Sequence, residues 1–304
     1  MLISMAWKEM LQDKKYEGLT NNSLQSYYGV WLTLGKWLEE NKIEHVDQLT
    51  PRVFKLYLRH CTEVRNNKPK SINTKLKLIR AFCHWLQDEG LTEGYMAENL
   101  KMVISDSETR IVKETDIRLA LRHLRRIKRR EDDFYAVRNH AIIVFLIGTG
   151  LRANELCQLN RSDIDSSGLI ILRKTKARKF SSVPLSERVA RELQEWQEYE
   201  RQIFAEKHLP EPLFCTREGR RLTRNGLRLM FNRVRERAGI EGTFCCHGMR
   251  NAFIKGLLKG GANLREAQLL ARHSRIDMTE KYIGYFQNEL QDAIDEHDPL
   301  KGLI

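Results

Sequence analysis

The sequence lacks any apolar run long enough to cross a lipid bilayer. Its longest apolar run, AIIVFLIGTGL at 141–151, is well short of the roughly 20 residues that a membrane-spanning helix needs. The N-terminus, MLISMAWKEM, also lacks the basic and then apolar pattern of a secretory signal. We therefore expect no membrane span and a cytoplasmic location.

Signatures of disulfides and of zinc are also missing. The six cysteines form no CxxC pair, which in a chain of this length is typical of reduced thiols. Cys245, Cys246 and His247 are adjacent. However, neighbouring cysteines do not easily close on one tetrahedral ion, and no second ligand pair follows at zinc spacing. We therefore expect neither a disulfide framework nor a metal site.

Proline is scarce, with six residues in 304, and long alternating polar–apolar stretches are few. Both absences favour a mainly helical chain, and apolar stripes at helical spacing run through 22–41 and 71–88. The stripes consist of Leu24, Tyr28, Trp31, Leu34 and Leu38 in the first and Ile72, Leu76, Ile79, Phe82 and Leu86 in the second. Segment 168–185, in which two apolar ends flank a basic tip, predicts a β-hairpin. The expected fold class is mainly α with a small antiparallel β-sheet.

The length of 304 residues favours two domains over one. Residues 103–114 are polar and lack periodicity, which is typical of a linker. The sequence therefore predicts a helical domain over 1–102 and a larger α+β domain over 115–304, with a last helix over 287–296.

Acidic residues are too few to balance the basic ones, and the formal net charge is +12. Most of the excess lies in 105–304, which holds 37 basic against 28 acidic residues. A basic surface attracts polyanions, and neutralised phosphates release counterions, so nucleic acid is the leading partner. A merely soluble basic protein is the alternative. The residues that we expect to contact DNA are Lys68, Lys70, Lys75, Lys77, Arg80, Arg125, Arg126, Arg129 and Arg224; solvated helix faces would look the same.

A domain that acts on a phosphodiester without a metal must surround the developing phosphate charge with cationic donors. Arginine suits this because its planar fork meets two oxygens and keeps its charge. A lysine or histidine must protonate the departing oxygen, and tyrosine can serve as the nucleophile. The chain holds such a set in the order Arg152, Lys176, His247, Arg250, His273 and Tyr282.

These residues lie in motifs that together resemble the tyrosine recombinases, the phage-integrase-like enzymes that break and rejoin DNA. The motifs are TGLRANELCQL at 149–159, the hairpin lysine, HGMRNAF at 247–253 and ARHSRIDMTEKY at 271–282. The resemblance covers nearly the whole chain. It implies that 1–102 is a SAM-like, core-binding DNA-binding domain and that 115–304 is the catalytic domain. Its last helix would be exchanged between protomers or packed on its own domain.

The resemblance implies a role for each motif residue. Arg152 and Arg250 would bind and stabilise the scissile phosphate. Glu155 would orient a basic group of the site; a plain surface ion pair with Arg152 is its alternative. His247 would contact the phosphate or assist proton transfer, and His273 would hydrogen-bond the phosphate.

The lysine and the tyrosine are assigned by the spacing that the family shows. Lys176 lies eight residues before the proline that closes the hairpin and would protonate the leaving 5′ oxygen. Lys174 remains an alternative because hairpin register can slip. Tyr282 follows His273 by nine residues and would be the nucleophile, which leaves Tyr285 to pack on the same helix or beside the site.

Three positions depart from the family's pattern. Asn251 stands where a histidine usually follows the second arginine, and Asn99-Leu100 replaces the Asn-Pro that often closes the first domain. Ala271-Arg272 replaces a Leu-Gly pair before the third motif's histidine. Because glycine permits backbone angles that arginine resists, the sequence does not predict the backbone conformation of the turn before His273.

The function implied is site-specific recombination of double-stranded DNA through a 3′-phosphotyrosyl intermediate and a Holliday junction. The resemblance further implies a homotetramer on two duplexes, with no metal, ATP or other cofactor, and a nucleoid-associated location. Accessory DNA-binding factors are further candidate partners. Integration, excision and resolution share these residues, and a simple Xer-like or transposon enzyme is favoured. The alternatives are a type IB topoisomerase-like relaxer, a non-catalytic DNA-binding regulator and a metal-dependent nuclease, although no carboxylate cluster supports the last.

Overall fold

The computed structural model describes residues 1–104, 112–172, 181–206, 208–273 and 275–280. The chain divides into two compact units, Met1–Glu108 and Thr109–Ile304. No helix within the described ranges is long and apolar enough to span a membrane.

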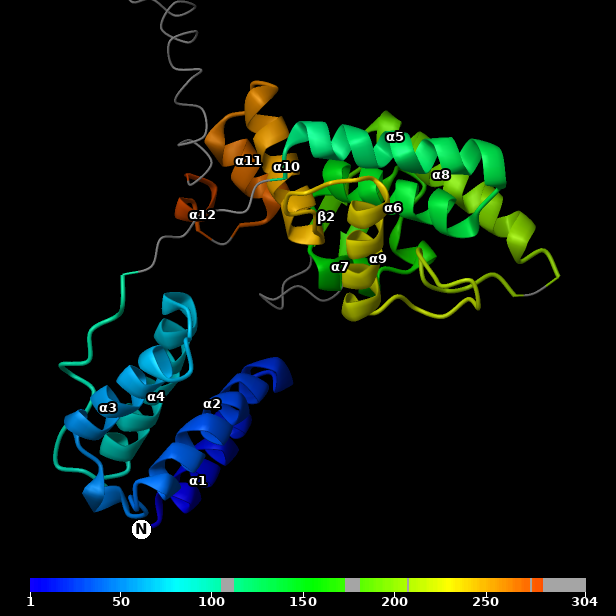
Figure 1. Cartoon of the computed structure of the whole chain (residues 1–304). Coiled ribbons are helices and arrows are strands. Elements are labelled where there is room, and N and C mark those ends of the chain that lie inside the picture. The colour runs from blue at the N-terminus through cyan, green and yellow to red at the C-terminus, as the bar shows by residue number, and fades with distance from the viewer. Residues whose placement is uncertain (105–111, 173–180, 207, 274, 281–304) are drawn as a thin grey trace, which may run out of the picture. The chain divides into compact units, whose positions relative to one another are not determined.

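Unit 1 is helical (Figure 1). Its elements are α1 (Ile3–Tyr16), α2 (Asn21–Glu40), the 3-10 turn η1 (Val46–Gln48), α3 (Pro51–Glu63) and α4 (Pro69–Asp88). Threonine side chains cap the N-termini of two of these helices. The Thr20 hydroxyl accepts from the Ser23 amide at the start of α2, and the Thr50 hydroxyl accepts from the Val53 amide at the start of α3. These bonds satisfy amides that have no partner within the helix.

Aromatic side chains form the centre of unit 1. The ring of Trp7 lies 4.7 Å from that of Phe82 and 5.2 Å from that of Trp31, measured between centroids. The predicted stripe of α4 is buried throughout. The predicted stripe of α2 is wrong at one position: Tyr28 is 47% exposed, whereas Tyr27 is buried. Both tyrosines fit helical spacing, and the packing of α1 and α4 against α2 selects Tyr27.

Unit 2 holds the remaining helices and the hairpin. Its elements are α5 (Glu114–Glu131), α6 (Phe134–Thr149), α7 (Ala153–Gln158), η2 (Arg161–Asp163), β1 (Leu169–Leu172), β2 (Ser181–Pro184), α8 (Glu187–Ile203), α9 (Arg224–Arg237), α10 (Cys246–Lys259), α11 (Leu264–Ala271) and α12 (Asp277–Glu280). Helices α5, α8 and α10 pack on α6, whose residues are buried on almost every side. A helix that is apolar all round belongs in a core, and α6 is the centre of this unit.

The end of α6 positions the segment that follows it. Gly150 ends α6 in the left-handed region with φ 60°, and a Cβ there would lie 2.3 Å from the ring of Phe253 on α10. Glycine is therefore needed for both the backbone angle and the space. The chain turns at once into α7, which begins directly after Arg152.

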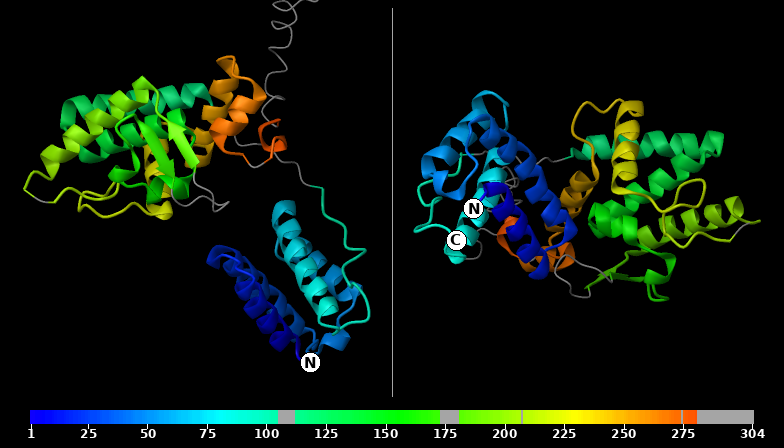
Figure 2. Two further views of the ribbon diagram at one scale, coloured as in Figure 1. Left: turned by 180° about the vertical axis from the view of Figure 1, so that it is seen from behind. Right: turned by 90° about the horizontal axis from the view of Figure 1, so that it is seen from below.

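The predicted hairpin is confirmed by strands β1 and β2, which pair antiparallel from Leu169 opposite Pro184 to Leu172 opposite Ser181 (Figure 2). The expected fold class, mainly α with a small antiparallel sheet, is confirmed with it. The hairpin tip at 173–180, which carries Lys174 and Lys176, lies outside the described residues, as do Tyr282, Tyr285 and the helix expected over 287–296.

Candidate active site

Arg152 and Glu155 form the first part of the site, at the start of α7. The Glu155 carboxylate accepts from the Arg152 amide at 2.8 Å and from Arg152 Nη1 at 2.8 Å. A carboxylate that reaches back to the first amide of its helix also favours that helix start. The i,i+3 ion pair with Arg152 is therefore present, but Glu155 is only 8% exposed, so its carboxylate does not lie at the surface.

Arg250 joins three segments that are distant in the sequence. Its side chain is buried on α10 and donates to the carbonyl of Gly150 and to that of Ala271. These carbonyls end α6 and α11, respectively. A buried guanidinium needs such acceptors, and meeting them brings α10 and both helix ends to one point.

Arg272 also belongs to the site, although in the sequence it stands out only as a departure from the family's pattern. Its Nη2 donates to Glu155 Oε2 at 3.1 Å, and its own carbonyl accepts from Arg152 Nη2 at 3.2 Å. Its backbone ends α11 in the left-handed region with φ 55° and ψ 45°. The turn thus keeps the conformation that suits glycine while carrying an arginine. No feature of the sequence other than its place beside His273 indicated this contact.

Glu155 stays ionised between the two guanidinium groups. Burial alone raises the pKa of this carboxyl, but the hydrogen bond from the Arg152 amide and the charge of Arg272 outweigh that effect and hold the pKa below its ordinary value. One carboxylate therefore serves two arginines, and the cluster keeps an excess of positive charge.

His273 lies beside this group and is held from both sides. Its Nδ1 is 2.8 Å from Oγ1 of the fully buried Thr279, and its amide donates to the Gln268 carbonyl at 3.0 Å. Burial, followed by the charges of Arg250 and Arg152, lowers its pKa to about 4. The imidazole is consequently neutral near pH 7. Neither Gln268 nor Thr279 was identified from the sequence.

His247 lies in the first turn of α10, three residues before Arg250, and its side chain is exposed. Its charge acts on the pKa of His273, so the two histidines belong to one electrostatic environment. The neighbouring Cys246 thiol has a pKa raised to about 12 by burial and stays protonated. Among the described residues, no group of His, Cys, Asp and Glu side chains could hold a metal ion.

The structure therefore brings together Arg152, Glu155, Arg250 and His273, with His247 in electrostatic reach. We call these five residues and Arg272 the cation cluster. The other two predicted catalytic residues, Lys176 and Tyr282, lie outside the described residues and remain predictions.

The basic residues expected to contact DNA differ in their surroundings. Lys68, Lys70 and Lys77 are exposed on unit 1. Lys75, in contrast, donates to Thr33 Oγ1 at 2.9 Å and to the Tyr57 hydroxyl at 3.2 Å, and burial lowers its pKa. Arg80 donates to the carbonyl of Leu100. The open basic face of α4 is thus narrower than the sequence indicates, because Lys75 and Arg80 are engaged within unit 1.

The four candidates for DNA contact in unit 2 are open to solvent. Arg125, Arg126 and Arg129 are exposed on α5, and Arg224 is exposed at the first residue of α9. They remain candidates for phosphate contacts.

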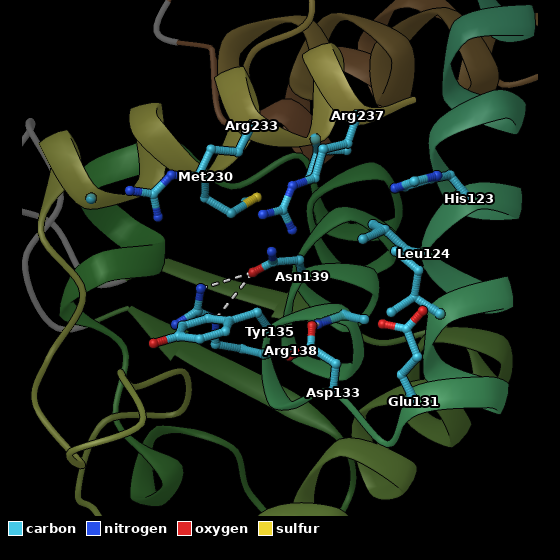
Figure 3. Close-up of a pocket in the computed structure, with 14 residues that line it drawn as sticks. His123, Leu124, Glu131, Asp133, Tyr135, Arg138, Asn139, Met230, Arg233 and Arg237 are labelled. Carbon is cyan, nitrogen blue, oxygen red and sulfur yellow. Dashed lines mark hydrogen bonds between the residues drawn. The ribbon is translucent and has the colours of Figure 1, made fainter. Parts of the chain in front are cut away.

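A pocket of about 430 Å³ lies between α5, α6 and α9. Figure 3 shows Arg233 and Arg237 on one side of it and Asp133 and Glu131 on the other, with Arg138 bonded to its neighbour Asn139. Its lining mixes both signs of charge. None of the residues of the cation cluster lines it, so the two are separate features.

Comparison with known proteins gives two family matches. The profile described as "Phage integrase family" matches residues 111–289, and that described as "Phage integrase, N-terminal SAM-like domain" matches residues 6–90. "Tyrosine recombinase XerD" of Staphylococcus epidermidis (strain RP62A) is 25% identical over 287 residues, which cover 93% of this chain and 94% of the relative. "Tyrosine recombinase XerC" of Myxococcus xanthus is 31% identical over 166 residues, 54% of this chain and 55% of the relative.

Solved structures share the fold. A lambda integrase tetramer bound to a Holliday junction matches with a TM-score of 0.75 and 14% identity, over 93% of this chain and 77% of that one. The Tn1549 transposon integrase in complex with transposon right end DNA matches with a TM-score of 0.73 and 19% identity, over 91% and 94%. At these identities the likeness is one of architecture.

Proposed function

The chain belongs to the phage integrase family and is a tyrosine recombinase, and we propose that its cation cluster binds the scissile phosphate of a specific DNA site. The observation that carries this proposal is the convergence of Arg152 and Arg250, from two separate segments, on the turn at residues 271–273 that carries His273. A phosphoryl transfer without a metal ion requires hydrogen-bond donors and positive charge that converge on the phosphate.

The two arginines share the work of charge stabilisation. Arg250 donates to the Gly150 and Ala271 carbonyls, and we assign to the same guanidinium a contact with a phosphate oxygen, since this group has five donors. Arg152 is the more open of the two, with a side chain that is 36% exposed. Held by Glu155, it presents a fixed fork to a second oxygen.

His273 acts as a neutral hydrogen-bond donor. His273 Nδ1 lies 2.8 Å from the Thr279 hydroxyl; we assign the hydroxyl as the donor, which places the ring hydrogen on Nε2, where it donates to a non-bridging oxygen of the phosphate. The lowered pKa of the ring agrees with this assignment, because a neutral imidazole can be placed among arginines without repulsion.

The covalent steps fall to Tyr282 and Lys176. Tyr282 gives up its phenolic proton, with His247 assisting the transfer, and its oxygen attacks phosphorus to form the 3′-phosphotyrosyl bond while the bond to the 5′ oxygen breaks. Lys176 protonates that oxygen; Lys174 is the alternative. A 5′-hydroxyl of the partner duplex then attacks the phosphotyrosyl bond and frees Tyr282. The bond energy is kept throughout, so ATP is not consumed.

The rest of the chain serves the same reaction. We assign DNA binding to residues 1–102 and catalysis to 115–304, joined by the linker at 103–114. Two duplexes exchanging strands through a Holliday junction require four protomers, and the shared fold with the lambda integrase tetramer supports this assembly. A DNA substrate further implies a cytoplasmic, nucleoid-associated location. Transposition and accessory DNA-binding factors are further parts of the proposal, and the fold of the Tn1549 integrase supports the former.

The test begins with the DNA site, which is selected from a pool of randomised duplexes by the purified protein. A nicked suicide duplex carrying the selected site should then trap a covalent protein–DNA adduct with the wild-type chain and none with Tyr282→Phe. Tyr285→Phe is the matched control and should trap normally. An adduct on Tyr282→Phe would contradict the assignment of the nucleophile. Relaxed circles without strand exchange would favour the topoisomerase-like alternative, and binding without cleavage would favour the regulator.

A further inference from the structure

Arg272 occupies a backbone conformation that arginine normally avoids. Its φ of 55° and ψ of 45° lie in the left-handed region, where the Cβ of an L-residue crowds the following carbonyl. Such a residue persists where its surroundings compensate for the strain, and these positions gather at functional sites. Glycine would fit this turn without strain, so the backbone conformation does not explain why an arginine stands here.

The side chain is buried against the catalytic groups. It is 10% exposed, and besides Glu155 it donates to the carbonyls of Leu270 at 3.2 Å and Gly150 at 3.4 Å. Its Nε is buried with no hydrogen-bond partner among the described residues. Burying a guanidinium with one unsatisfied donor is unfavourable. Ending helix α11 does not require a buried guanidinium, so the Arg272 side chain serves another purpose.

Arg272 and Arg152 divide one carboxylate between them. Arg152 Nη1 contacts Glu155 Oε1, and Arg272 Nη2 contacts Glu155 Oε2. In addition, Arg152 Nη2 donates to the Arg272 carbonyl. Two nitrogens of Arg152 are thus held in place, one by the Glu155 carboxylate that Arg272 also binds and the other by the carbonyl of Arg272 itself. The side chain of Arg272 is 10% exposed and that of Arg152 is 36% exposed, so Arg152 is the more accessible of the two arginines.

The sharing also decides the charge of the site. A Glu155 carboxylate paired with Arg152 alone would cancel much of the charge that Arg152 offers to a phosphate. With a second guanidinium on its other oxygen, the carboxylate orients Arg152 while the three groups together remain positive.

We propose that Arg272 is a positioning residue for strand cleavage: it takes up half of the Glu155 carboxylate and supplies its own carbonyl, and both contacts set the guanidinium of Arg152 for the scissile phosphate. This role rests on the proposed function. Arg272 acts through Arg152 and Glu155 and does not touch the DNA.

The test uses Arg272→Gly, which keeps the left-handed turn and removes the guanidinium. On the selected suicide duplex at saturating protein, the rate of adduct formation should fall about 10- to 100-fold, the range for a misplaced catalytic group. The dissociation constant for the same duplex should change less than about twofold, since Arg272 is not at the DNA surface. Arg272→Lys, and millimolar guanidinium ion added to the glycine variant, should each restore part of the rate.

Three further variants separate positioning from structure. Lys42→Gly makes the same backbone change at another left-handed residue, φ 57°, in unit 1 and should leave the rate unchanged. Adding Glu155→Gln to Arg272→Gly should lower the rate no further, because the carboxylate that Arg272 balanced is gone. Arg272→Asn, which also tolerates the left-handed region, repeats the test if the glycine variant melts early.

The outcomes are distinct. A wild-type rate for Arg272→Gly, or a double variant whose loss is the product of the single losses, overturns the role of Arg272 while the recombinase assignment stands. A wild-type chain that forms no adduct on its selected site overturns the proposed function, and the role of Arg272 falls with it.

Discussion

Replacing Gly150 with alanine tests whether the end of α6 holds Arg250 in place. The new Cβ would sit at φ 60°, where an L-residue costs about 1–2 kcal/mol. It would also lie 2.3 Å from the ring of Phe253, and relieving such a contact in a packed core costs about 1–3 kcal/mol. The free energy of unfolding of unit 2 should therefore fall by about 2–5 kcal/mol.

Activity should fall by more than stability accounts for. Phe253 lies one turn after Arg250 on α10, and the Gly150 carbonyl is one of the two that bind the Arg250 guanidinium. Moving either displaces Arg250 from the position that we propose for phosphate binding, and a shift of about 1 Å costs roughly 100-fold in rate. The assay is adduct formation on the suicide duplex at a temperature where the variant is folded.

Gly239→Ala is the matched control. Gly239 lies in the same unit at φ 68°, and a Cβ there would meet nothing within 4 Å. Its unfolding free energy should fall by only about 1–2 kcal/mol, with an unchanged cleavage rate. Urea unfolding followed by circular dichroism compares the two variants on the same transition. Equal losses of stability, together with normal cleavage by Gly150→Ala, would refute the reasoning.

Three other predictions concern single groups. His273 has a pKa of about 4 in the folded chain against 6.5 ordinarily. The unfolded chain therefore binds the proton first on acidification, and the stability contributed by the neutral ring is complete above pH 6.5 and lost by pH 4. His273→Gln should reduce the fall in unfolding free energy over that window by about 2 kcal/mol, allowing for partial exposure; a parallel fall in both proteins would contradict this. Lys77→Met should weaken DNA binding and reduce the slope of log affinity against log salt by about 1. Lys75→Met should leave that slope unchanged, because the Lys75 ammonium is hydrogen-bonded to Thr33 and Tyr57. Equal slopes for the two variants would show that these hydrogen bonds do not keep Lys75 from contacting DNA. EDTA should not change the cleavage rate, and a loss restored by a divalent ion would favour the nuclease.

Local patterns in the sequence were sufficient for most of the architecture. The α4 stripe and the hairpin follow from spacings of three to four and of two residues, which backbone geometry imposes on any chain. The stripe of α2 failed at Tyr28 because Tyr27 satisfies the same spacing, and only the neighbouring helices distinguish them. Arg152 and Glu155 were also within reach of the sequence, since three residues on a helix is a contact distance.

What the sequence alone determined is therefore local: the helices, the hairpin, and the order and spacing of the motif residues. The tertiary structure decided which groups meet. Arg250 binds carbonyls that are 100 and 21 residues away, and Arg272 reaches a carboxylate 117 residues away. No periodicity encodes such separations. They arise because α6, α10 and α11 pack in one way, and burial then obliges each guanidinium to find acceptors where those helices end.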